Sequence, residues 1–490
     1  MSYDLLVVGG GINGCAIARE AALNGQRVLL VESDDIGAHT SSASSRLIHG
    51  GLRYLEYYEF RLVREALQER ERLLKAAPHL IRPLEFVVPQ HGSQRPAWMM
   101  RAGLMLYDML ARSSMPRSRK LGPQDRISRL ALRTADKGYA YWDAWTDDSR
   151  LTLSNALDAA DLGAEIRTRS GLASARRVGE LWEARLETGE TVRARAIVNA
   201  AGPWVGELLN KVGITTKSKV RLVKGSHITV NRLYHGRHAY LLQQPDRRVV
   251  FALNYDTDYT TIGTTDVPVD DPRDPVIDDA EIDYLLEAAN RHFRYRIGRH
   301  NIVHSWSGIR ALYDDGAKEA RAVTRDYVLE LDEDGPAALS VFGGKITTAR
   351  ALAEDAITRL APVLGIEKPV TSRDRSYPGG DIHDFNAFLE RVRGRFPFLG
   401  DSRSLRMARA YGTRLFTMLD DVRSEAAMGR QFGDGLSEVE AKWMRAQEWA
   451  ITAEDALMRR SKCAIHMTEA EREEFARWWD SEDGAIDLEV

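Results

Sequence analysis

The residues best suited to chemistry lie in one stretch, 40–55, which reads TSSASSRLIHGGLRYL. Small hydroxyl side chains fill its first half, and His49 and Arg53 flank the glycine pair at 50–51. A neutral imidazole can accept a proton near physiological pH. A guanidinium can hold a phosphate or carboxylate through paired hydrogen bonds. A solvent-exposed polar loop is the alternative, so the interpretation depends on the elements that position the stretch.

The glycines of residues 9–14, GGGING, satisfy the pattern G-x-G-x-x-G. Gly9 would allow the sharp bend from strand to helix, and Gly11 would let the backbone approach a pyrophosphate. Gly14 would let the helix pack closely on the strand. The phosphates would then meet the free amides at the positive end of that helix. Because the pattern alone is common, its flanking elements decide its value.

Those flanking elements have the order that a dinucleotide needs. Residues 3–8 are strand-like, 12–25 show the periodicity of an alanine-rich helix, and 27–32 read as a second buried strand. A strand–helix–strand unit implies a parallel sheet. The second strand ends at Glu32, whose carboxylate can accept hydrogen bonds from a ribose diol. The sequence therefore predicts a Rossmann-like nucleotide-binding unit.

The later segments favour FAD over NAD. After Glu32 the chain does not continue into further βα units but runs through the hydroxyl-rich stretch into an amphipathic helix at 57–77. Segments typical of the nucleotide-binding unit return at 198–205, VNAAGPWV, and at 340–357, where FGGK leads into a helix. The N-terminus of that helix would favour negative charge on a reduced flavin. An ordinary strand–helix turn is the alternative for FGGK.

Composition limits the class of protein. A length of 490 residues predicts two or three domains, and 44% hydrophobic with 28% charged residues is ordinary for a globular chain. A net charge of −3 does not suggest nucleic acid as a partner. The two cysteines cannot form a disulfide framework, and we expect no metal site. No apolar run approaches the roughly 20 residues that span a bilayer, so we expect a soluble or membrane-surface protein.

Together these segments closely resemble the membrane-associated, FAD-dependent glycerol-3-phosphate dehydrogenases of aerobic metabolism. The matching segments extend to about residue 350 and read VVGGGINGCAIAREAALNG, TSSASSRLIHGGLRYLEYYEFRLVREALQERERLL, VNAAGPWV, KGSHI, IGTTDV, TRDY and SVFGGKITT. The resemblance implies an α/β fold, α+β overall, in which a Rossmann-like FAD-binding domain carries an inserted antiparallel β-sheet substrate domain and precedes an all-α C-terminal domain. It also implies oxidation of sn-glycerol 3-phosphate to dihydroxyacetone phosphate, with electrons passing through FAD to a membrane quinone.

The expected domain limits follow the shifts in pattern along the chain. Residues 1–80, 146–220 and 300–377 are assigned to the FAD-binding domain, 81–145 and 221–299 to the substrate-binding domain, and 378–490 to the helical C-terminal domain.

The substrate phosphate calls for guanidinium groups. Arg53 and Arg310 fit this role, Arg325 in TRDY is a third candidate, and Tyr54 either bonds the substrate or packs in the core. One departure from the family is Ala311, which follows Arg310 where the family tends to have proline.

Alcohol oxidation also needs a proton acceptor. His49 is the preferred general base and His227 in KGSHI is its rival, while Lys345 would stabilise the alkoxide or the reduced flavin; Arg310 is a further catalytic candidate.

The expected FAD contacts come from the glycine turn, the hydroxyl-rich stretch and the two late segments. They are Gly9, Gly11, Ile12, Asn13, Gly14, Glu32, Thr40, Ser41, Ser44, Ser45, Leu47, Ile48, His49, Gly50, Gly51, Ala201, Gly202, Gly344, Lys345, Ile346 and Thr347.

The resemblance also places the chain as a peripheral protein on the inner, cytoplasmic face of the cytoplasmic membrane, and we expect a homodimer. The Met- and Leu-rich segment 97–120, with a basic end, has the composition of an interfacial helix, and a buried helix of the substrate domain explains it equally well. Three alternatives stay open: a glycerol-3-phosphate oxidase that uses oxygen, an amine or 2-hydroxy acid oxidoreductase of the same superfamily, and a non-catalytic flavin-binding protein.

Overall fold

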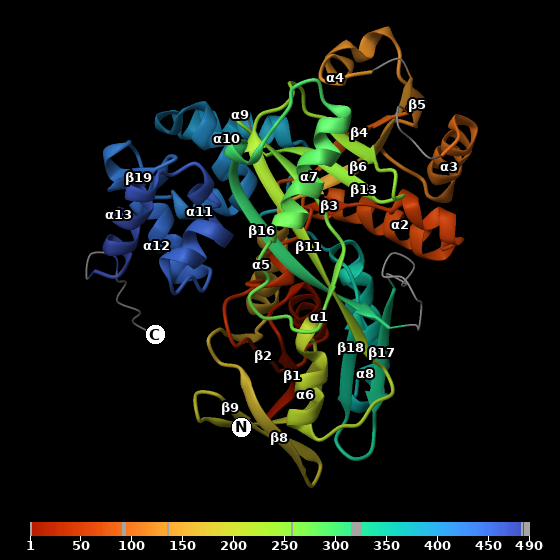
Figure 1. The fold of residues 1–490 in the computed structure, drawn as a ribbon. Coiled ribbons are helices and arrows are strands. Elements are labelled where there is room, and N and C mark those ends of the chain that lie inside the picture. The colour runs from red at the N-terminus through yellow and green to blue at the C-terminus, as the bar shows by residue number, and fades with distance from the viewer. Residues whose placement is uncertain are drawn as a thin grey trace.

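The computed structural model describes residues 2–90, 95–134, 137–255, 258–314, 326–481 and 484. Two large sheets and a helical C-terminal region make up the chain (Figure 1). The first sheet contains the N-terminal strand, and the second, with its covering helices, lies above it in this view. The predicted α/β architecture is confirmed.

The first sheet is built on buried, β-branched and leucine-rich strands. Its path is β17-β18-β10-β1-β2-β7, with β8 and β9 attached through β10. Four pairs, β1 with β10, β1 with β2, β10 with β18 and β2 with β7, are parallel, as the strand–helix–strand pattern predicts. The strands are β1 (Ser2–Val8), β2 (Val28–Val31), β7 (Glu165–Arg167), β8 (Leu172–Val178), β9 (Leu181–Leu186), β10 (Thr191–Asn199), β17 (Tyr327–Asp332) and β18 (Ala338–Gly343).

Helix α1 (Ile12–Leu23) packs against both α5 (Asp148–Asp161) and α8 (Ala349–Leu364). Its small residues Cys15, Ala18 and Ala21 are fully buried, so neighbouring elements approach closely on all sides. Helix α6 (Val205–Val212) packs against β8 instead. Tight packing of this kind fixes where α1 begins, and therefore where a phosphate would bind.

The second sheet is mainly antiparallel and follows β15-β11-β14-β13-β12-β4-β6-β3, with β16 on the other side of β11 and β5 beside β6. Helix α7 (Asp279–His292) covers β11 to β14, and α2 (Phe60–Ala76) packs with α3 (Ala97–Leu110); α4 (Arg126–Leu130) is a single short turn. The strands are β3 (Leu47–Ile48), β4 (Ile81–Pro89), β5 (Arg119–Lys120), β6 (Gly138–Thr146), β11 (Val220–Asn231), β12 (Ala239–Gln243), β13 (Val249–Tyr255), β14 (Tyr259–Gly263), β15 (Val267–Val269) and β16 (Ile302–Tyr313).

The domain limits stay a prediction, and one strand bears on them. Strand β16 falls in the range 300–377 that the sequence assigns to the cofactor domain, yet it pairs with β11 of the second sheet from Val220 to Val230. Long-range pairing of this kind leaves no local signal, because the partner strand lies about 80 residues earlier. We accordingly propose that β16 belongs with the substrate unit.

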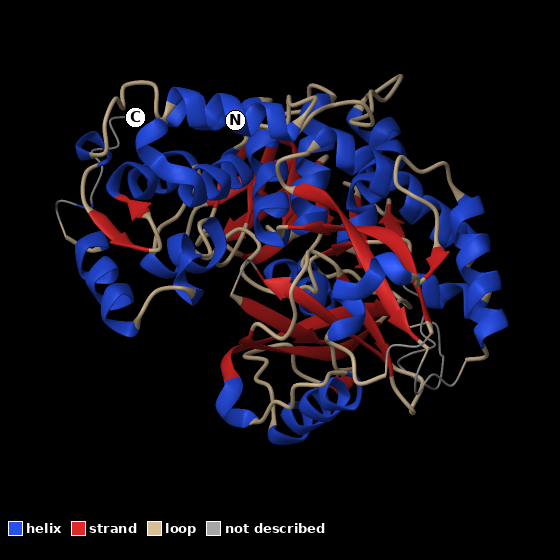
Figure 2. Cartoon of the chain, turned by 90° about the horizontal axis from the view of Figure 1, so that it is seen from above, coloured by secondary structure: helices blue, strands red, loops and turns tan. Residues whose placement is uncertain are grey.

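The C-terminal region is helical, with its own core of aromatic and methionine side chains. Its helices are α9 (Phe385–Arg395), α10 (Gly400–Tyr411), α11 (Arg414–Met418), α12 (Glu438–Gln447) and α13 (Glu469–Trp479), with a π-helical turn at Asp455–Arg460. A small two-stranded sheet, β19 (Gln431–Gly433) with β20 (Leu436–Ser437), interrupts them (Figure 2). The sequence predicts no strand here, because two- and three-residue strands carry no readable alternation.

Candidate active site

A cavity of about 760 Å³ is lined by residues of both large sheets and of the loops between them. Most of the expected cofactor contacts line it: Gly9, Gly11, Ile12, Asn13, Glu32, Thr40, Ser41, Ser44, Ser45, Leu47, His49, Gly51, Ala201, Gly202, Gly344, Lys345, Ile346 and Thr347. Gly14, Ile48 and Gly50 do not line it. The structure therefore brings together five segments that are far apart in the sequence.

The glycine turn has the geometry that the pattern predicts. Gly9 has φ +114°, in the left-handed region. A Cβ on Gly14 would stand 1.9 Å from the Gly9 carbonyl oxygen, so this position permits only glycine. Gly14 therefore acts in helix packing, which explains why it lies behind the cavity wall rather than in it.

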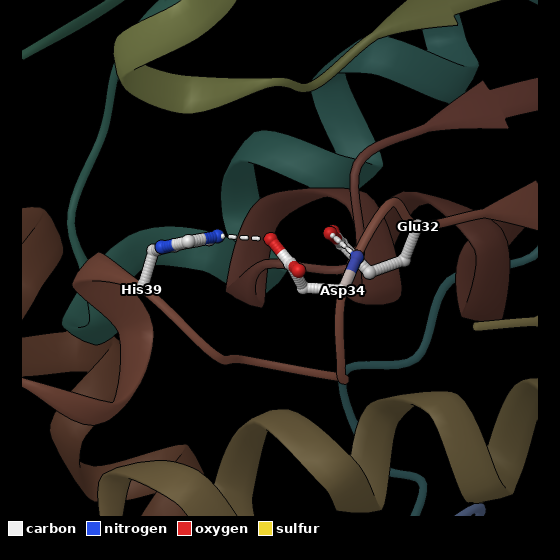
Figure 3. Close-up of side chains that lie close together, drawn as sticks. All are labelled: Glu32, Asp34 and His39. Atoms are coloured by element: carbon white, nitrogen blue, oxygen red, sulfur yellow. Dashed lines mark hydrogen bonds and ion pairs between the residues drawn. The ribbon is translucent and has the colours of Figure 1, made fainter. Parts of the chain in front are cut away.

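The Asp34 carboxylate and the His39 imidazole lie beside Glu32 at one wall of the cavity (Figure 3). Glu32 accepts hydrogen bonds from the backbone N–H groups of Gly10, at 2.6 Å, and Asp34, at 2.8 Å. Asp34 in turn pairs with His39 Nε2 at 2.8 Å. Both oxygens of Glu32 are thus engaged by backbone, which fixes its side chain at the end of β2 where a ribose would lie.

The hydroxyls of the stretch 40–55 are used to build the site. Ser41 Oγ accepts a hydrogen bond from Ile12 N at 2.9 Å, at the first turn of α1. Thr40 donates to the Ile309 carbonyl of β16 at 2.6 Å, and Ser45 Oγ lies 2.9 Å from His227 Nε2. The stretch is therefore not an exposed polar loop, because its hydroxyls join the two sheets across the cavity.

The segment around His49 is held by buried partners behind it. His49 N donates to Thr347 Oγ1 at 3.3 Å, and Gly50 N donates to the Tyr107 hydroxyl at 2.9 Å. Tyr107 donates to buried Asp143 at 2.8 Å, and Arg70 pairs with the same carboxylate at 2.7 Å. The backbone of Gly50 is thus held on the side away from the cavity, which explains why Gly50 does not line it. None of Tyr107, Asp143 and Arg70 is among the functional residues that the sequence predicts.

Gly51 makes the bend that follows. It has φ +79°, and an added Cβ would stand 2.2 Å from the Tyr54 ring. Tyr54 lines the cavity beside Arg53, and Lys345 Nζ lies 5.2 Å from the centre of the Tyr54 ring. Lys345 and Tyr54 thus place a cation beside a phenol in the cavity wall, and Arg53 adds a second cation to the lining.

Glycines in the second sheet let two functional side chains lie flat on it. A Cβ on Gly225 would stand 2.2 Å from Arg310 Nη2, and a Cβ on Gly263 would stand 2.1 Å from the His227 ring. The His227 ring also stacks on Trp306, with centroids 5.0 Å apart. The motifs KGSHI and IGTTDV thus supply the flat floor on which these side chains rest.

The Arg310 guanidinium is anchored by three acceptors. Its Nη1 pairs with Asp266, and its Nη2 donates to Thr264 Oγ1 at 2.7 Å and to the Thr265 carbonyl at 3.2 Å. The Asp266 carboxylate compensates much of its charge. Asp266 and Thr264 line the cavity but are not among the residues that the sequence predicts; the quoted IGTTDV motif contains both.

Both candidate bases are neutral in this environment. Burial, then the cations Lys345 and Arg70, lowers the pKa of His49 to about 3. Burial, then Arg310 and Arg46, lowers the pKa of His227 to about 3. Each imidazole is therefore uncharged at physiological pH, and the same burial and cations that keep it uncharged also lower its proton affinity.

The lining suits a dinucleotide with a ring system at one end. Among the described residues, the buried atoms Asn13 Oδ1 and His227 Nδ1 have no hydrogen-bond partner, and both residues line the cavity. Buried polar atoms of this kind call for a ligand or water. Leu241 and Phe251 add an apolar wall. Arg325 lies outside the described residues.

Comparisons with known proteins agree with this geometry. The family model described as FAD dependent oxidoreductase matches residues 4–350. D-erythritol 1-phosphate dehydrogenase of Brucella abortus (strain 2308) is 47% identical over 490 residues, covering 98% of both chains. Glycerol-3-phosphate dehydrogenase of Pseudomonas aeruginosa is 46% identical, covering 98% of this chain and 95% of the relative.

A solved structure shows the same fold. Glycerol-3-phosphate dehydrogenase from Bacillus halodurans, complexed with FAD, superposes with a TM-score of 0.75 at 26% identity, covering 98% of this chain and 94% of that one. Taken with the glycine turn and the cavity, these similarities show that the chain belongs to the FAD-dependent oxidoreductase family, on the branch that contains the FAD-dependent glycerol-3-phosphate dehydrogenases.

Proposed function

We propose that this chain uses FAD to oxidise sn-glycerol 3-phosphate to dihydroxyacetone phosphate and passes the electrons to a membrane quinone. One observation carries the proposal: a single cavity is lined by the dinucleotide turn, by the cations Arg53, Arg310 and Lys345, and by the imidazoles of His49 and His227. A substrate with a phosphate dianion beside a secondary alcohol needs cations and a proton acceptor together. The Pseudomonas relative supports this choice of substrate.

FAD, when bound, supplies the hydride acceptor, its N5 atom, for the hydrogen on C2 of the substrate. The glycine turn and Glu32 would hold its ADP portion, and the segments 47–51 and 343–347 would border its ring. The chain's own residues then bind the phosphate, orient C2 and accept the hydroxyl proton.

Arg53 and Lys345 are assigned to the phosphate. Both line the cavity, Lys345 lies beside the Tyr54 ring and Arg53 precedes Tyr54 in the chain, so a dianion bound between them would be compensated by two cations. Arg310 is held by Asp266 and two further acceptors, so it has fewer donors left for a bidentate contact. We assign it to ordering the alcohol end of the substrate.

His49 is assigned as the proton acceptor and His227 as the alternative. Lys345 is among the causes that lower the pKa of His49, so a phosphate dianion bound beside Lys345 would offset that effect and raise the proton affinity of the imidazole. Binding of the substrate phosphate would thereby make His49 a stronger base for the substrate hydroxyl proton. His227 is constrained by Ser45 and by stacking on Trp306, an arrangement better suited to positioning.

Anaerobic mixing of the purified holoenzyme with glycerol 3-phosphate tests the proposal. The expected result is loss of the visible absorbance of the flavin with formation of one equivalent of dihydroxyacetone phosphate. A flavin that stays oxidised would reject both the activity and its mechanism, and would favour a non-catalytic flavin-binding role. If the chain is an amine or 2-hydroxy acid oxidoreductase, the flavin would lose its absorbance with a substrate of that class and not with glycerol 3-phosphate.

D-erythritol 1-phosphate is the second candidate substrate, because the Brucella relative named for it is as similar to this chain as the glycerol-3-phosphate dehydrogenases are. Both compounds present a phosphate and a secondary alcohol and differ in the length of the carbon chain. Comparison of kcat/KM for the two separates the candidates. Peroxide yield measured against quinone reduction in the same assay distinguishes a dehydrogenase from an oxidase.

An exposed apolar surface on α3 and α4 supports a membrane quinone as the acceptor. On α3, Trp98 and Met109 are each 71% exposed, while Leu104 and Tyr107 on the opposite side are buried. Ile127 on α4 is also exposed, and α3 and α4 lie at the same upper end in Figure 1. A helix with one apolar exposed face and basic neighbours suits the surface of a bilayer. We define the membrane face as the exposed apolar residues of α3 and α4, among them Trp98, Met105, Met109 and Ile127.

Within the part of the chain that the structure describes, no helix is both long and apolar enough to cross a membrane. We therefore propose peripheral attachment at the inner face of the cytoplasmic membrane through the membrane face. A homodimer is the proposed assembly, and sedimentation of the detergent-free holoenzyme measures it directly.

A further inference from the structure

A buried carboxylate sits in the loop that lines the adenine side of the FAD cavity. Asp35 is 1% exposed and lies between two residues that line the cavity, Asp34 and Gly37. Gly37 N donates to the Gly10 carbonyl of the glycine turn at 3.0 Å. The loop that contains Asp35, residues 33–46, is therefore joined directly to the turn that receives the pyrophosphate.

The partners of Asp35 come from the far end of the chain. Arg460 binds it bidentately, with Nη1 and Nη2 each 2.6 Å from a carboxylate oxygen. Arg459 Nε adds a third bond at 2.6 Å. The carboxylate is thus enclosed by two guanidinium groups that lie more than 420 residues later in sequence.

The other half of the loop is held from the same place. Lys462 Nζ lies 2.8 Å from both Asp147 and Asp148 at the start of α5. Asp148 accepts hydrogen bonds from Ser44 N at 3.1 Å and Ser44 Oγ at 2.8 Å. The segment 459–462 therefore acts on both halves of the loop 33–46, directly through Arg459 and Arg460 and indirectly through the contact of Lys462 with Asp148.

These cations are themselves fixed in place. Arg460 donates two hydrogen bonds to the Glu448 carbonyl, at 2.9 and 2.7 Å. Arg459 is paired with Asp455, which also binds Arg169 of the first sheet's flank. Arg459 and Arg460 belong to the π-helical turn, and Lys462 follows it closely. All three cations lie beyond the residues 4–350 that the family model matches. The C-terminal region thus presents a rigid cationic surface to the loop.

The charge balance gives this contact a consequence for the cofactor. Asp35 and Glu32 both act on α1, since together they raise the pKa of the Cys15 thiol after burial has raised it most. A carboxylate so close to the start of α1 opposes a bound pyrophosphate unless it is neutralised. Two arginines supply that neutralisation and set the position of the loop at the same time.

We propose that the C-terminal region retains FAD, with Arg459, Arg460 and Lys462 as positioning residues that neutralise Asp35 and hold the loop 33–46 closed over the pyrophosphate. The proposal depends on the FAD site alone and not on which polyol phosphate is oxidised. It gives the helical region, whose described residues do not line the cavity, a function in the same site.

The test measures FAD release from the purified holoenzyme after dilution, followed as the rise of free-flavin fluorescence. Arg460→Met should release FAD about 10-fold faster or more, because it leaves the buried Asp35 carboxylate with the single Arg459 contact in place of three hydrogen bonds. Adding Asp35→Asn to Arg460→Met should return the rate toward that of the parent chain, since the carboxylate charge that Arg459 alone must compensate is then gone. Arg430→Met, which removes a C-terminal arginine from an exposed pair with Glu474, is the matched control.

Two further variants keep the outcome decisive if Arg460→Met does not fold. Lys462→Met and Arg459→Met each remove one cation and leave the Arg460 fork in place, and each should still accelerate FAD release relative to Arg430→Met. Arg460→Lys, which keeps the charge but loses the fork, should fall between the parent and Arg460→Met. If these folded variants release FAD at the parent rate and only their thermal unfolding changes, the C-terminal region is a structural neighbour and the proposal is wrong.

Discussion

At the scale of single residues, we assign different side chains of the cavity to phosphate binding and to proton transfer. Lys345 lies beside the ring of Tyr54, the residue that follows Arg53, whereas His49 directly follows β3 and His227 lies on β11, two strands of the second sheet. The imidazoles stay neutral because desolvation and nearby cations lower their pKa, and a phosphate bound beside Lys345 would offset that cation and raise the proton affinity of His49.

Replacement of Arg53 by alanine should raise KM for glycerol 3-phosphate by about 10- to 100-fold, the loss expected when a charge-assisted contact to phosphate is removed. FAD content should stay normal. Steady-state kinetics with Arg64→Ala, an exposed arginine of α2, as control check this. An unchanged KM would remove Arg53 from the phosphate site.

His49→Gln should slow anaerobic flavin reduction by about 10²- to 10⁴-fold, as for a lost general base. Stopped-flow absorbance measures the rate, with exposed His300→Gln as the control. A decrease of less than about threefold would transfer the role to His227 or Lys345, and His227→Gln then becomes the first test.

At the scale of elements, the floor of the cavity depends on strands that carry glycine where a side chain must lie flat. Gly225 on β11 and Gly263 on β14 are both in extended backbone that other residues could adopt, so the requirement comes from Arg310 and His227 and not from φ. Because Gly225 and Gly263 have no side chain, the strands leave room for Arg310 and His227 to lie against the sheet.

Gly225→Ala should therefore impair catalysis while leaving the fold intact. The new Cβ, 2.2 Å from Arg310 Nη2, would push the guanidinium off the sheet and away from Asp266. We expect a fall in kcat/KM of about 10-fold or more, comparable to the loss of one positioned contact. Gly103→Ala on α3, where an added Cβ meets nothing within 4 Å, is the matched control.

The membrane face yields a prediction at the same scale. Met105 and Met109 are 48% and 71% exposed on α3, so Met105→Glu with Met109→Glu should move the enzyme from the membrane pellet to the soluble fraction. Dye-coupled activity should be retained, because neither residue lines the cavity. Val370→Glu, on an exposed valine outside the membrane face, should stay in the pellet. Loss of folding in the double variant would show that α3 acts as a core helix.

At the scale of the whole molecule, buried neutral histidines make stability depend on pH. Burial, then Arg150 and Arg409, lowers the pKa of His79 to about 3, and the side chain is 1% exposed. The unfolded chain takes up the proton below about pH 6.5 and the folded chain only near 3. The contribution of His79 is therefore fully present above 6.5 and is lost as pH falls through this window.

Between pH 7 and 5, His79 should account for a decrease of about 2 kcal/mol in the free energy of unfolding. Denaturant unfolding of His79→Gln at both pH values should show a correspondingly weaker pH dependence than the parent chain. His300→Gln serves as the exposed control. Equal slopes for His79→Gln and the parent would contradict the pKa shift.

Much of the cofactor unit could be predicted from short-range pattern. The turn at 9–14, the strand that ends at Glu32 and the helix after FGGK are each read from neighbouring residues, because glycine spacing and hydrophobic period are local properties. The candidate site residues His49, Arg53, Lys345, His227 and Arg310 came from these patterns together with the family resemblance, and all of them line one cavity. Their individual roles stay predictions.

Only the tertiary structure decided what those residues meet. The sequence by itself determined an FAD-binding βαβ unit, a second strand-rich unit and a helical C-terminal region. It did not indicate that Asp266 holds Arg310, that Tyr107 and Asp143 stand behind Gly50, or that Arg460 encloses Asp35. Such contacts join segments separated by up to 425 residues. They follow from how sheets and helices pack, and packing leaves no periodic signal in the chain.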